Sequence, residues 1–387
     1  MKPLLELRGV TVGVPSVARG RVAPARELGR AASSRGREAL REVSFELEGG
    51  RCLVVVGPNG SGKTTLLRVL ALLQAPTSGT YRFDGVDVGR ATRRQRLELR
   101  RRVAFLRQKP VLLDATVEKN VAFGLRVRGV PKREAAEMVG RVLEEFDLLH
   151  LRNQRARALS GGEVQRVALA QVLALPADLV LLDEVSANLD PENVDLAHGL
   201  VRRLRKDPEK TLVLSTHDPT EALAFADVVG VLRSGCLVQL GPPAEVFLAP
   251  KDDYAARFVG YANVYAGSAE WDEERGVAEV LVDGQSQSQM KLLVATKVSG
   301  QVKACVRPES VVISLEPPAE SSARNALEGR VVEVRDAGQS CHVLVEVAGH
   351  EMLVAVTRRS RDALRLRPGT RAHLTFKATD VRVFPVS

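Results

Sequence analysis

Apolar residues in this chain follow two different spacings, and the change between them lies near residue 260. Upstream, short Val- and Leu-rich runs at 52–56, 179–182 and 211–215 alternate with segments whose apolar residues recur every three or four positions, such as 133–146. Short apolar runs bounded by polar residues predict buried strands, and the longer spacing predicts amphipathic helices. Strands that alternate with helices in this way predict a three-layer α/β core.

The remaining third of the chain has the pattern of short strands. Val-rich stretches in which apolar and polar residues alternate, such as 277–282 and 342–347, are separated by Gly and Pro. This spacing predicts one or two small all-β modules. We therefore expect an α/β domain over about 1–245, a linker over 246–261 and an all-β domain over 262–387.

One segment of the first domain follows neither spacing. Residues 15–38 are rich in Arg, Ala, Ser and Gly, and they separate two predicted strands at 4–14 and 39–48. Such a composition favours a mobile loop, so we expect a basic insertion here.

Composition narrows the class of protein. The formal net charge of +9 suits phosphate-rich ligands or an anionic membrane surface but selects none of them. The four cysteines are scattered without a C-x-x-C pair, so we expect reduced thiols rather than a metal or disulfide framework. No apolar run reaches the roughly 18 residues of a membrane span, and the charged N-terminus does not resemble a signal peptide. We expect a soluble cytoplasmic protein whose membrane role, if it has one, needs a partner.

The glycine-rich stretch after the first buried run carries the strongest chemical signal. Residues 57–65 read GPNGSGKTT between a predicted strand and a predicted helix, the context that a phosphate-binding loop requires. Glycines let backbone N–H groups approach phosphate oxygens, and the helix start adds positive charge. Lys63 is expected to neutralise the β- and γ-phosphates, and Thr64 to ligate Mg²⁺. The residues expected to bind a nucleoside triphosphate are Gly57, Pro58, Asn59, Gly60, Ser61, Gly62, Lys63, Thr64 and Thr65.

Two carboxylates end the second buried run. Asp183 and Glu184 follow four apolar residues, so a buried strand would deliver them to the sheet edge where ligands gather. Asp183 is expected to hold Mg²⁺ through water, and Glu184 to polarise the attacking water as general base. An acidic turn after a strand is the plainer alternative, which the upstream phosphate loop disfavours.

A pair of glycines, Gly161 and Gly162, precedes a predicted apolar helix. Ser160 can cap that helix, and Glu163 three residues later completes a capping box. The same Ser160, with the N–H groups of Gly161 and Gly162, can also bind an anion at the helix start. Because the chain already has one phosphate loop, this segment would serve a nucleotide held elsewhere, most simply by a second copy.

Six motifs in a fixed order resemble the ATP-binding subunit of an ABC transporter over about residues 1–245. They are GPNGSGKT, Gln108 at a strand end, LSGGE, LLDE, the loop at 186–190 and His217 after a strand. The resemblance implies a P-loop NTPase cassette, with a RecA-like core and a helical subdomain over about 109–175. Two cassettes would sandwich ATP, each phosphate loop facing the partner's LSGGE segment.

The resemblance also implies roles for single residues. Gln108 would contact Mg²⁺ and the γ-phosphate and relay its presence to a permease. His217 would contact the γ-phosphate and position water, and Asp190 would belong to the nucleotide site. The catalytic set expected from motif and resemblance together is Glu184, His217 and Lys63; the Mg²⁺ set is Thr64, Gln108 and Asp183.

Two departures from the family pattern stand out. Family members usually carry an aromatic near the end of the first strand to stack on adenine, whereas here no aromatic precedes Phe45 and the aligned region holds Val14 and the basic insertion. Aliphatic surface or an inserted arginine would have to replace it, and weaker discrimination between bases is expected. In the second departure, Val185 and Ser186 stand where Pro-Thr is common, outside the catalytic pair.

The C-terminal third resembles the TOBE/Mop-like β-barrel, OB-like in fold, that is attached to importer ATPases and binds oxyanions. The resemblance rests on the segments VRPESV, NALEGRV, TRRS, the segment 364–369 and FKATDV. Cassette segments at 71–79, 121–125 and 186–191 are similar to tungstate and molybdate importer ATPases. Thr357, Ser360 and Lys377 carry hydroxyl and ammonium donors suited to an oxyanion. A barrel that serves only as a dimerisation or partner surface is the alternative.

These observations together predict the ATPase of an importer for an oxyanion such as tungstate or molybdate. It would act as a homodimer with Mg²⁺ and ATP, at the cytoplasmic face of the membrane, with permease subunits and an extracytoplasmic solute-binding protein. Import of sulfate, polyamine, iron or sugar is the alternative within this class. A non-transport ATPase acting on nucleic acid is disfavoured, because neither an inserted coiled coil nor a second cassette occurs. An inactive sensor module is disfavoured by the intact Asp183–Glu184 pair.

Overall fold

The computed structural model describes residues 3–13, 38–187, 189–284, 289–317, 321–337 and 340–386. The predicted basic insertion lies outside these ranges except for its last residue, and so does Asn188. The chain divides into two compact units, Met1–Val246 and Phe247–Ser387. In the ranges described, no helix is long and apolar enough to cross a membrane.

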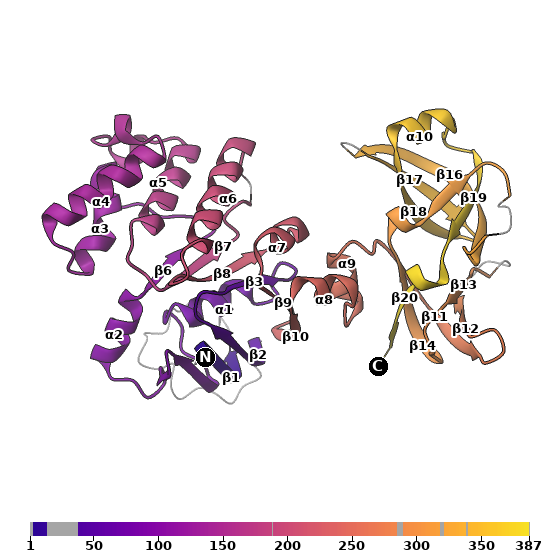
Figure 1. The fold of residues 1–387 in the computed structure, drawn as a ribbon, viewed down its shortest axis with the longest axis horizontal. Helices are drawn as coiled ribbons and strands as arrows, with labels where there is room; N and C mark the ends of the chain where they lie inside the picture. The colour runs from indigo at the N-terminus through magenta and orange to yellow at the C-terminus, as the bar shows by residue number, and fades with distance from the viewer. Residues whose placement is uncertain are drawn as a thin grey trace, which may run out of the picture. The chain divides into compact units, whose positions relative to one another are not determined.

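A six-stranded sheet forms the centre of the first unit (Figure 1), in the order β10-β9-β3-β8-β7-β6. Its pairs are parallel except β9 with β10. All residues of β3, β7 and β8 are buried, which explains the apolar runs at 52–56, 179–182 and 212–214. The strands are β3 (Cys52–Val56), β6 (Val103–Leu106), β7 (Leu179–Asp183), β8 (Thr211–Thr216), β9 (Val228–Arg233) and β10 (Cys236–Gly241).

A smaller antiparallel sheet shares the core of this unit, in the order β2-β1-β4-β5. Its strands are β1 (Pro3–Gly13), β2 (Glu38–Glu48), β4 (Ser78–Phe83) and β5 (Val86–Asp87). The apolar faces of β1 and β2 pack with helix α1 (Lys63–Leu70) and with the central sheet in one buried cluster.

The region predicted to be mostly helical contains α3 (Val117–Val127), α4 (Lys132–Glu145) and α5 (Gly161–Leu173), which pack on one another. Figure 1 shows these three helices grouped beyond the β6 edge of the central sheet. The first unit also contains the α-helices α2 (Arg93–Arg101), α6 (Pro191–Arg205) and α7 (Pro219–Phe225), and α8 (Pro243–Leu248) spans the boundary between the two units in the chain. The prediction of a mixed α/β unit with a helical part is confirmed.

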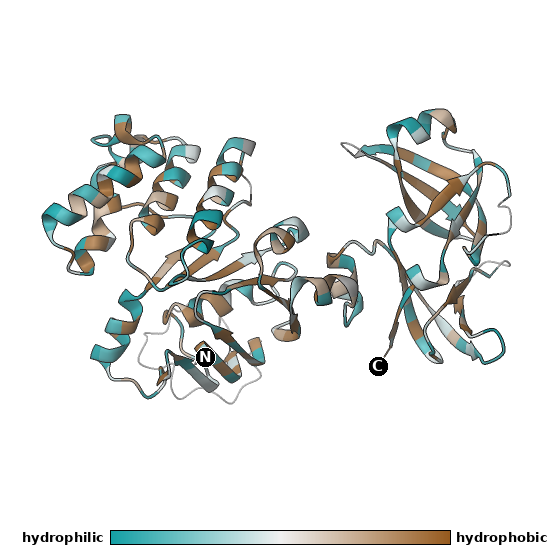
Figure 2. Ribbon diagram, viewed as in Figure 1, coloured by the Kyte–Doolittle hydropathy of each residue, from teal (hydrophilic) through white to brown (hydrophobic). Residues whose placement is uncertain are grey.

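The second unit contains two five-stranded antiparallel sheets around one apolar core, ordered β13-β12-β11-β14-β20 and β15-β19-β16-β17-β18. The prediction of an all-β domain is therefore confirmed. One helix, α9 (Asp253–Phe258), precedes its first strand, and another, α10 (Arg358–Ala363), lies between β18 and β19. Figure 2 shows apolar residues along the strands of both units and hydrophilic residues on the helix surfaces. The strands are β11 (Asn263–Asp272), β12 (Val277–Val282), β13 (Lys291–Val294), β14 (Gly300–Val306), β15 (Val312–Ser314), β16 (Asn325–Ala337), β17 (Ser340–Val347), β18 (His350–Thr357), β19 (Arg371–Phe376) and β20 (Arg382–Pro385).

The two halves of this unit exchange their last strands. β15 follows β14 in the chain but pairs with β19, and β20 follows β19 but pairs with β14. Each half also begins with a buried asparagine that both accepts from and donates to the backbone of one residue in another strand. Asn263 bonds Leu353 in this way, and Asn325 bonds Leu293.

Candidate functional site

The glycine-rich loop joins β3 to α1 through two positions that only glycine fits. A Cβ on Gly57 would lie 2.3 Å from the carbonyl oxygen of Leu232. Gly62 has a φ of +110°, and a Cβ there would lie 2.5 Å from the carbonyl oxygen of Ala39. Neighbouring chain segments thus fix the loop, and glycine leaves its backbone free to turn inward. Pro58, Asn59 and Gly60 are exposed at its crest.

Inside the loop, the buried Ser61 hydroxyl has no hydrogen-bond partner among the described residues. A buried polar atom without a partner is costly, so this hydroxyl fits a ligand oxygen better than an apolar environment. Thr65, half-buried, follows on the first turn of α1.

Lys63 points back into this loop. Its Nζ donates to the carbonyl oxygens of Gly57, at 2.7 Å, and Pro58, at 3.3 Å. The same Nζ lies 3.2 Å from Oε1 of Glu184, and the two side chains are only 5% and 11% exposed. A largely buried ammonium group is therefore paired with the carboxylate that ends the neighbouring LLDE motif.

Asp183 is the last residue of β7 and is 3% exposed. Its Oδ1 accepts hydrogen bonds from the hydroxyls of Ser215, at 2.6 Å, and Thr64, at 3.2 Å. The other carboxylate, Glu184, has the left-handed φ of +48°, and its Oε2 accepts from Nε2 of Gln108 at 2.7 Å. Parallel strands β3, β6, β7 and β8 thus bring their carboxyl ends together at one point, as open α/β sheets do at ligand sites.

The oxygen donors in this cluster fit a magnesium ion. The Thr64 hydroxyl and the Asp183 carboxylate are hard oxygen ligands within hydrogen-bond reach of each other. Such oxygens, with phosphate and water, are the ligands that Mg²⁺ prefers. The amide of Gln108, expected in the same set, here turns its nitrogen toward Glu184.

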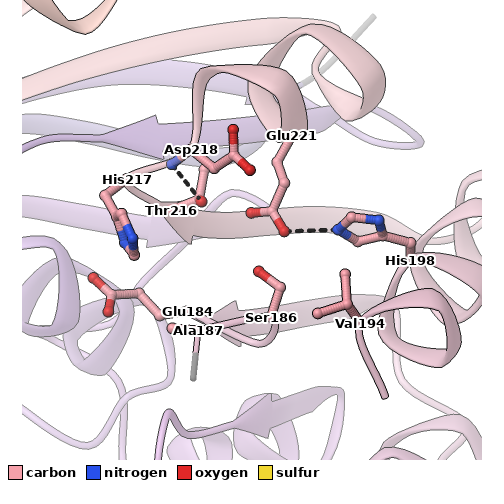
Figure 3. A pocket seen from close by; sticks show the side chains of 9 residues that line it. All are labelled: Glu184, Ser186, Ala187, Val194, His198, Thr216, His217, Asp218 and Glu221. Atoms are coloured by element: carbon pink, nitrogen blue, oxygen red, sulfur yellow. Dashed lines mark hydrogen bonds and ion pairs between the residues drawn. The ribbon is translucent and has the colours of Figure 1, made fainter. Parts of the chain in front are cut away.

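A pocket of about 200 Å³ adjoins Glu184 and contains the predicted His217 (Figure 3). Figure 3 shows the His217 ring and the Glu184 carboxylate at the same end of this pocket. At the other end, Nε2 of His198 lies 2.8 Å from Oε1 of Glu221, which joins α6 to α7. The pocket is lined by Glu184, Ser186, Ala187, Val194, His198, Thr216, His217, Asp218 and Glu221.

The LSGGE segment forms the capping box that its sequence allows. Ser160 N and Oγ both donate to Oε2 of Glu163, at 2.7 and 2.8 Å, and Glu163 N donates to Ser160 Oγ. These bonds favour the carboxylate and hold the pKa of Glu163 below its usual range. Ser160 and Gly161 are exposed, while Gly162 packs against Asn193 so closely that a Cβ would lie 2.8 Å from its Nδ2.

Asp190 has a local partner of the same kind. Its side chain accepts from the backbone N–H and the Nδ2 of Asn193, at 3.0 and 2.8 Å, at the start of α6. The backbone bond from Asn193 and then the side-chain bond lower the pKa of Asp190. In the described part of the chain, Ser160 and Asp190 form these bonds within their own turns and none with the phosphate loop.

The structure therefore sorts the predicted residues into two groups. Lys63, Thr64, Gln108, Asp183 and Glu184 form one bonded cluster, with His217 beside it. The segment 160–162 and Asp190 lie at two exposed helix starts outside that cluster.

The structure adds one residue that the sequence analysis did not single out, Ser215, and excludes Phe45 as the aromatic that stacks on adenine. Ser215 was not singled out there, although a hydroxyl that follows the apolar run 212–214 was a visible signal. Phe45, the first aromatic of the chain, is 6% exposed in the core, so it cannot stack on adenine. The region that would align with the stacking residue lies outside the described residues.

Comparison with known proteins gives two family matches. The model described as "ABC transporter" matches residues 40–187, and the "TOBE domain" model matches 321–383. A molybdate/tungstate import ATP-binding protein of Pyrococcus horikoshii is 34% identical over 89% of this chain and 96% of its own length. A sulfate/thiosulfate import ATP-binding protein of Gloeobacter violaceus is 32% identical over 90% and 92%.

Solved structures agree with the fold of the first unit. The CbiO1 component of an ABC transporter complex from Clostridium perfringens is 26% identical, with a TM-score of 0.53, and covers 67% of this chain and 95% of its own. A dimeric ATP-binding cassette bound to ADP and phosphate is 24% identical, with a TM-score of 0.53 over 62% of this chain and 98% of its own, and supports the fold alone.

Proposed function

The chain belongs to the ABC transporter family as an import ATP-binding protein, and from this premise we propose that it drives uptake of an oxyanion such as molybdate or tungstate. ATP binding and ATPase activity follow from the family. The bonded cluster of Lys63, Thr64, Asp183 and Glu184 is the observation that carries the chemistry. The choice of oxyanion is supported by relatives that match both units and are named for molybdate/tungstate import.

In the proposed reaction, the loop N–H groups and Lys63 hold the β- and γ-phosphates, and Lys63 stabilises charge that develops on the transferred phosphoryl group. Mg²⁺ held by Thr64 and Asp183 would neutralise phosphate charge. Glu184 accepts a proton from the attacking water, for which its carboxylate must turn from Lys63 and Gln108 toward that water. His217, at the same end of the pocket, orients the water and contacts the γ-phosphate.

A second copy of the chain is proposed to complete the site. Ser160 and Gly161 are exposed, and with Gly162 they begin a helix of 13 residues whose first N–H groups can bind phosphate. Because they lie outside the cluster of their own chain, they would close over the nucleotide held by the partner copy. Asp190 would then face the same interface from the start of α6.

The remaining partners follow from an importer of this family. Membrane-embedded permease subunits would hold the protein at the cytoplasmic face of the membrane, and an extracytoplasmic solute-binding protein would deliver the oxyanion. Gln108 would relay the state of the γ-phosphate toward the permease.

The second unit is proposed to bind the transported oxyanion. Thr357 and Ser360 converge, because their hydroxyls lie 2.9 Å apart at the start of α10. Lys377 does not join these two hydroxyls. It follows Phe376, which pairs with Asn325 at the start of β16, whereas Thr357 pairs with Ser340, which faces Ala337 at the other end of β16. The proposed donors are therefore the two hydroxyls, which can donate to the oxygens of an oxyanion. The competing interpretation, a dimerisation or partner surface, predicts no oxyanion binding.

Turnover by the full-length chain tests the catalytic assignment. Glu184→Gln keeps the shape of the side chain but cannot accept the proton, so the steady-state rate of ATP hydrolysis should fall by about 10²- to 10⁴-fold. Thermal unfolding should stay close to that of the parent. A Glu184→Gln protein that hydrolyses ATP at the parent rate would show that another group is the base.

Calorimetric titration of the full-length chain with tungstate, molybdate and sulfate tests the second assignment. Saturable binding of tungstate or molybdate, weakened by Ser360→Ala, supports the oxyanion role. Binding of sulfate alone would favour the sulfate-import alternative. If none of the three binds, the second unit is not an oxyanion sensor, and the partner-surface interpretation holds.

A further inference from the structure

Ser215 occupies the one position of β8 from which a side chain reaches both acids of the cluster. It lies two residues before His217 and is 2% exposed. Its Oγ donates to Oδ1 of Asp183 at 2.6 Å and accepts from the backbone N–H of Glu184 at 3.1 Å. A single hydroxyl therefore bridges the expected metal ligand and the expected base.

The bond to Asp183 fixes the orientation of a buried carboxylate. Asp183 is 3% exposed, so its oxygens depend on protein donors in place of water. The second donor, Thr64, is farther away at 3.2 Å and belongs to the helix side of the site. Ser215 comes from the neighbouring strand, whose position is fixed by parallel pairing with β7. It therefore sets the direction from which Asp183 presents its oxygens to a cation.

The bond to Glu184 secures an unfavourable backbone conformation. Glu184 has a φ of +48°, in the left-handed region that is unfavourable for a residue other than glycine. Its N–H is held by both the carbonyl oxygen of Ser215, at 3.0 Å, and the Ser215 hydroxyl, at 3.1 Å. These two acceptors hold the backbone of the turn after β7, from which the Glu184 side chain extends.

We propose that Ser215 is a positioning residue that aligns the Mg²⁺ ligand Asp183 and the base Glu184 relative to each other. It acts through these two acids and does not itself touch the nucleotide. The inference rests on the proposed function, because it takes Asp183 as a metal ligand and Glu184 as the base. Among the residues that the structure describes, Thr64 bonds the Asp183 side chain and Gln108 bonds the Glu184 side chain, and neither bonds both acids.

The test compares three variants of the full-length chain. Ser215→Ala removes the hydroxyl, and Ser215→Thr retains it in a residue suited to a strand. Thr211→Val is the matched control, because Thr211 is a fully buried hydroxyl on the same strand whose Oγ1 accepts from Gly50 outside the site.

Metal affinity is measured directly by electron paramagnetic resonance, with Mn²⁺ titrated into each protein saturated with AMP-PNP. Supporting groups around a metal ligand typically change affinity by about 10- to 100-fold, so Ser215→Ala should weaken Mn²⁺ binding by at least about tenfold. Ser215→Thr should restore it, and Thr211→Val should bind as the parent does. Affinity for AMP-PNP in EDTA should be equal in all proteins, because Ser215 does not contact phosphate.

Two outcomes overturn the proposal: parent-like Mn²⁺ binding by Ser215→Ala, or equal weakening by Thr211→Val, which would make the effect one of strand packing. Turnover measured beside Glu184→Gln separates this inference from the proposed function. If Glu184→Gln hydrolyses ATP normally, the base assignment fails. If Glu184→Gln is inactive and Ser215→Ala keeps parent metal affinity, only the role of Ser215 fails.

Discussion

The contact between Lys63 and Glu184 predicts that Glu184→Gln tightens nucleotide binding while it stops turnover. The two charged groups lie 3.2 Å apart and are 5% and 11% exposed. When ATP binds in the glycine-rich loop, its phosphate oxygens must compete with the Glu184 carboxylate for Lys63. The substitution removes the competing negative charge and keeps a side chain that Gln108 can still reach.

The size of the effect follows from the geometry. At 3.2 Å and an effective dielectric constant of about 20, the attraction between the two charges is about 5 kcal/mol. Desolvation of both groups offsets most of such a pair energy, so we expect a net of about 1.5 kcal/mol, or about tenfold in the dissociation constant. Because the pair is largely buried, the tightening should persist in 0.5 M salt, where the Debye length is only about 4 Å.

The assay is equilibrium binding of a fluorescent ATP analogue with excess Mg²⁺ to the full-length chain. Glu221→Gln is the matched control, since that carboxylate is 4% exposed, lies at the far end of the pocket and pairs with His198 instead of Lys63. It should change the dissociation constant by less than about threefold. Weaker or unchanged binding by Glu184→Gln would refute the reasoning, as would equal tightening in the Glu221→Gln control.

Three further results are expected. Asn325→Ala removes the partner of the half-buried N–H and carbonyl of Leu293 and should lower the free energy of unfolding of the second unit by about 2–3 kcal/mol. Urea denaturation followed by the fluorescence of Trp271, the single tryptophan of the chain, measures this loss. Ser160→Ala should reduce turnover at least about tenfold with unchanged nucleotide affinity in the single chain, because its hydroxyl acts on the partner's nucleotide. Burial raises the pKa of Cys52 from 9.0 to about 12. At pH 8 its thiolate fraction is therefore about a thousandfold below that of an ordinary thiol, so brief iodoacetamide treatment should label the half-buried Cys236 first by mass spectrometry.

Sequence reasoning predicted the local structural elements of the candidate site. The phosphate loop depends on a strand, glycines and a helix that follow one another in the chain, so its residues could be named in advance. The same is true of the capping box at Ser160 and Glu163, whose partners lie three residues apart. In the second unit, alternating residues predicted the strands because one face of each packs on a shared core.

Pairings between distant segments could not be predicted in this way. The exchange of β15 and β20 between the two sheets depends on which strands meet after folding, and alternation carries no information about a strand's partner. Ser215 was missed for the same reason. A serine after an apolar run is common, and its role becomes visible only when pairing of β7 with β8 sets it opposite Asp183.

The shared contacts of Glu184 imply that substitutions in this cluster will not have independent effects. Lys63 and Gln108 contact different oxygens of the same carboxylate, and Ser215 holds the backbone from which that carboxylate extends. Removing Gln108 frees Oε2 of Glu184 and lets that carboxylate turn further toward Lys63. The stronger contact with Lys63 then offsets part of the free energy lost with the Gln108 hydrogen bond. Residues in one such network usually couple by about 0.5–3 kcal/mol. The loss of ATPase activity in the double variant Gln108→Ala/Ser215→Ala, expressed as a free energy, should therefore differ from the sum of the losses in the two single variants. Both substitutions act on the orientation of one side chain, that of Glu184.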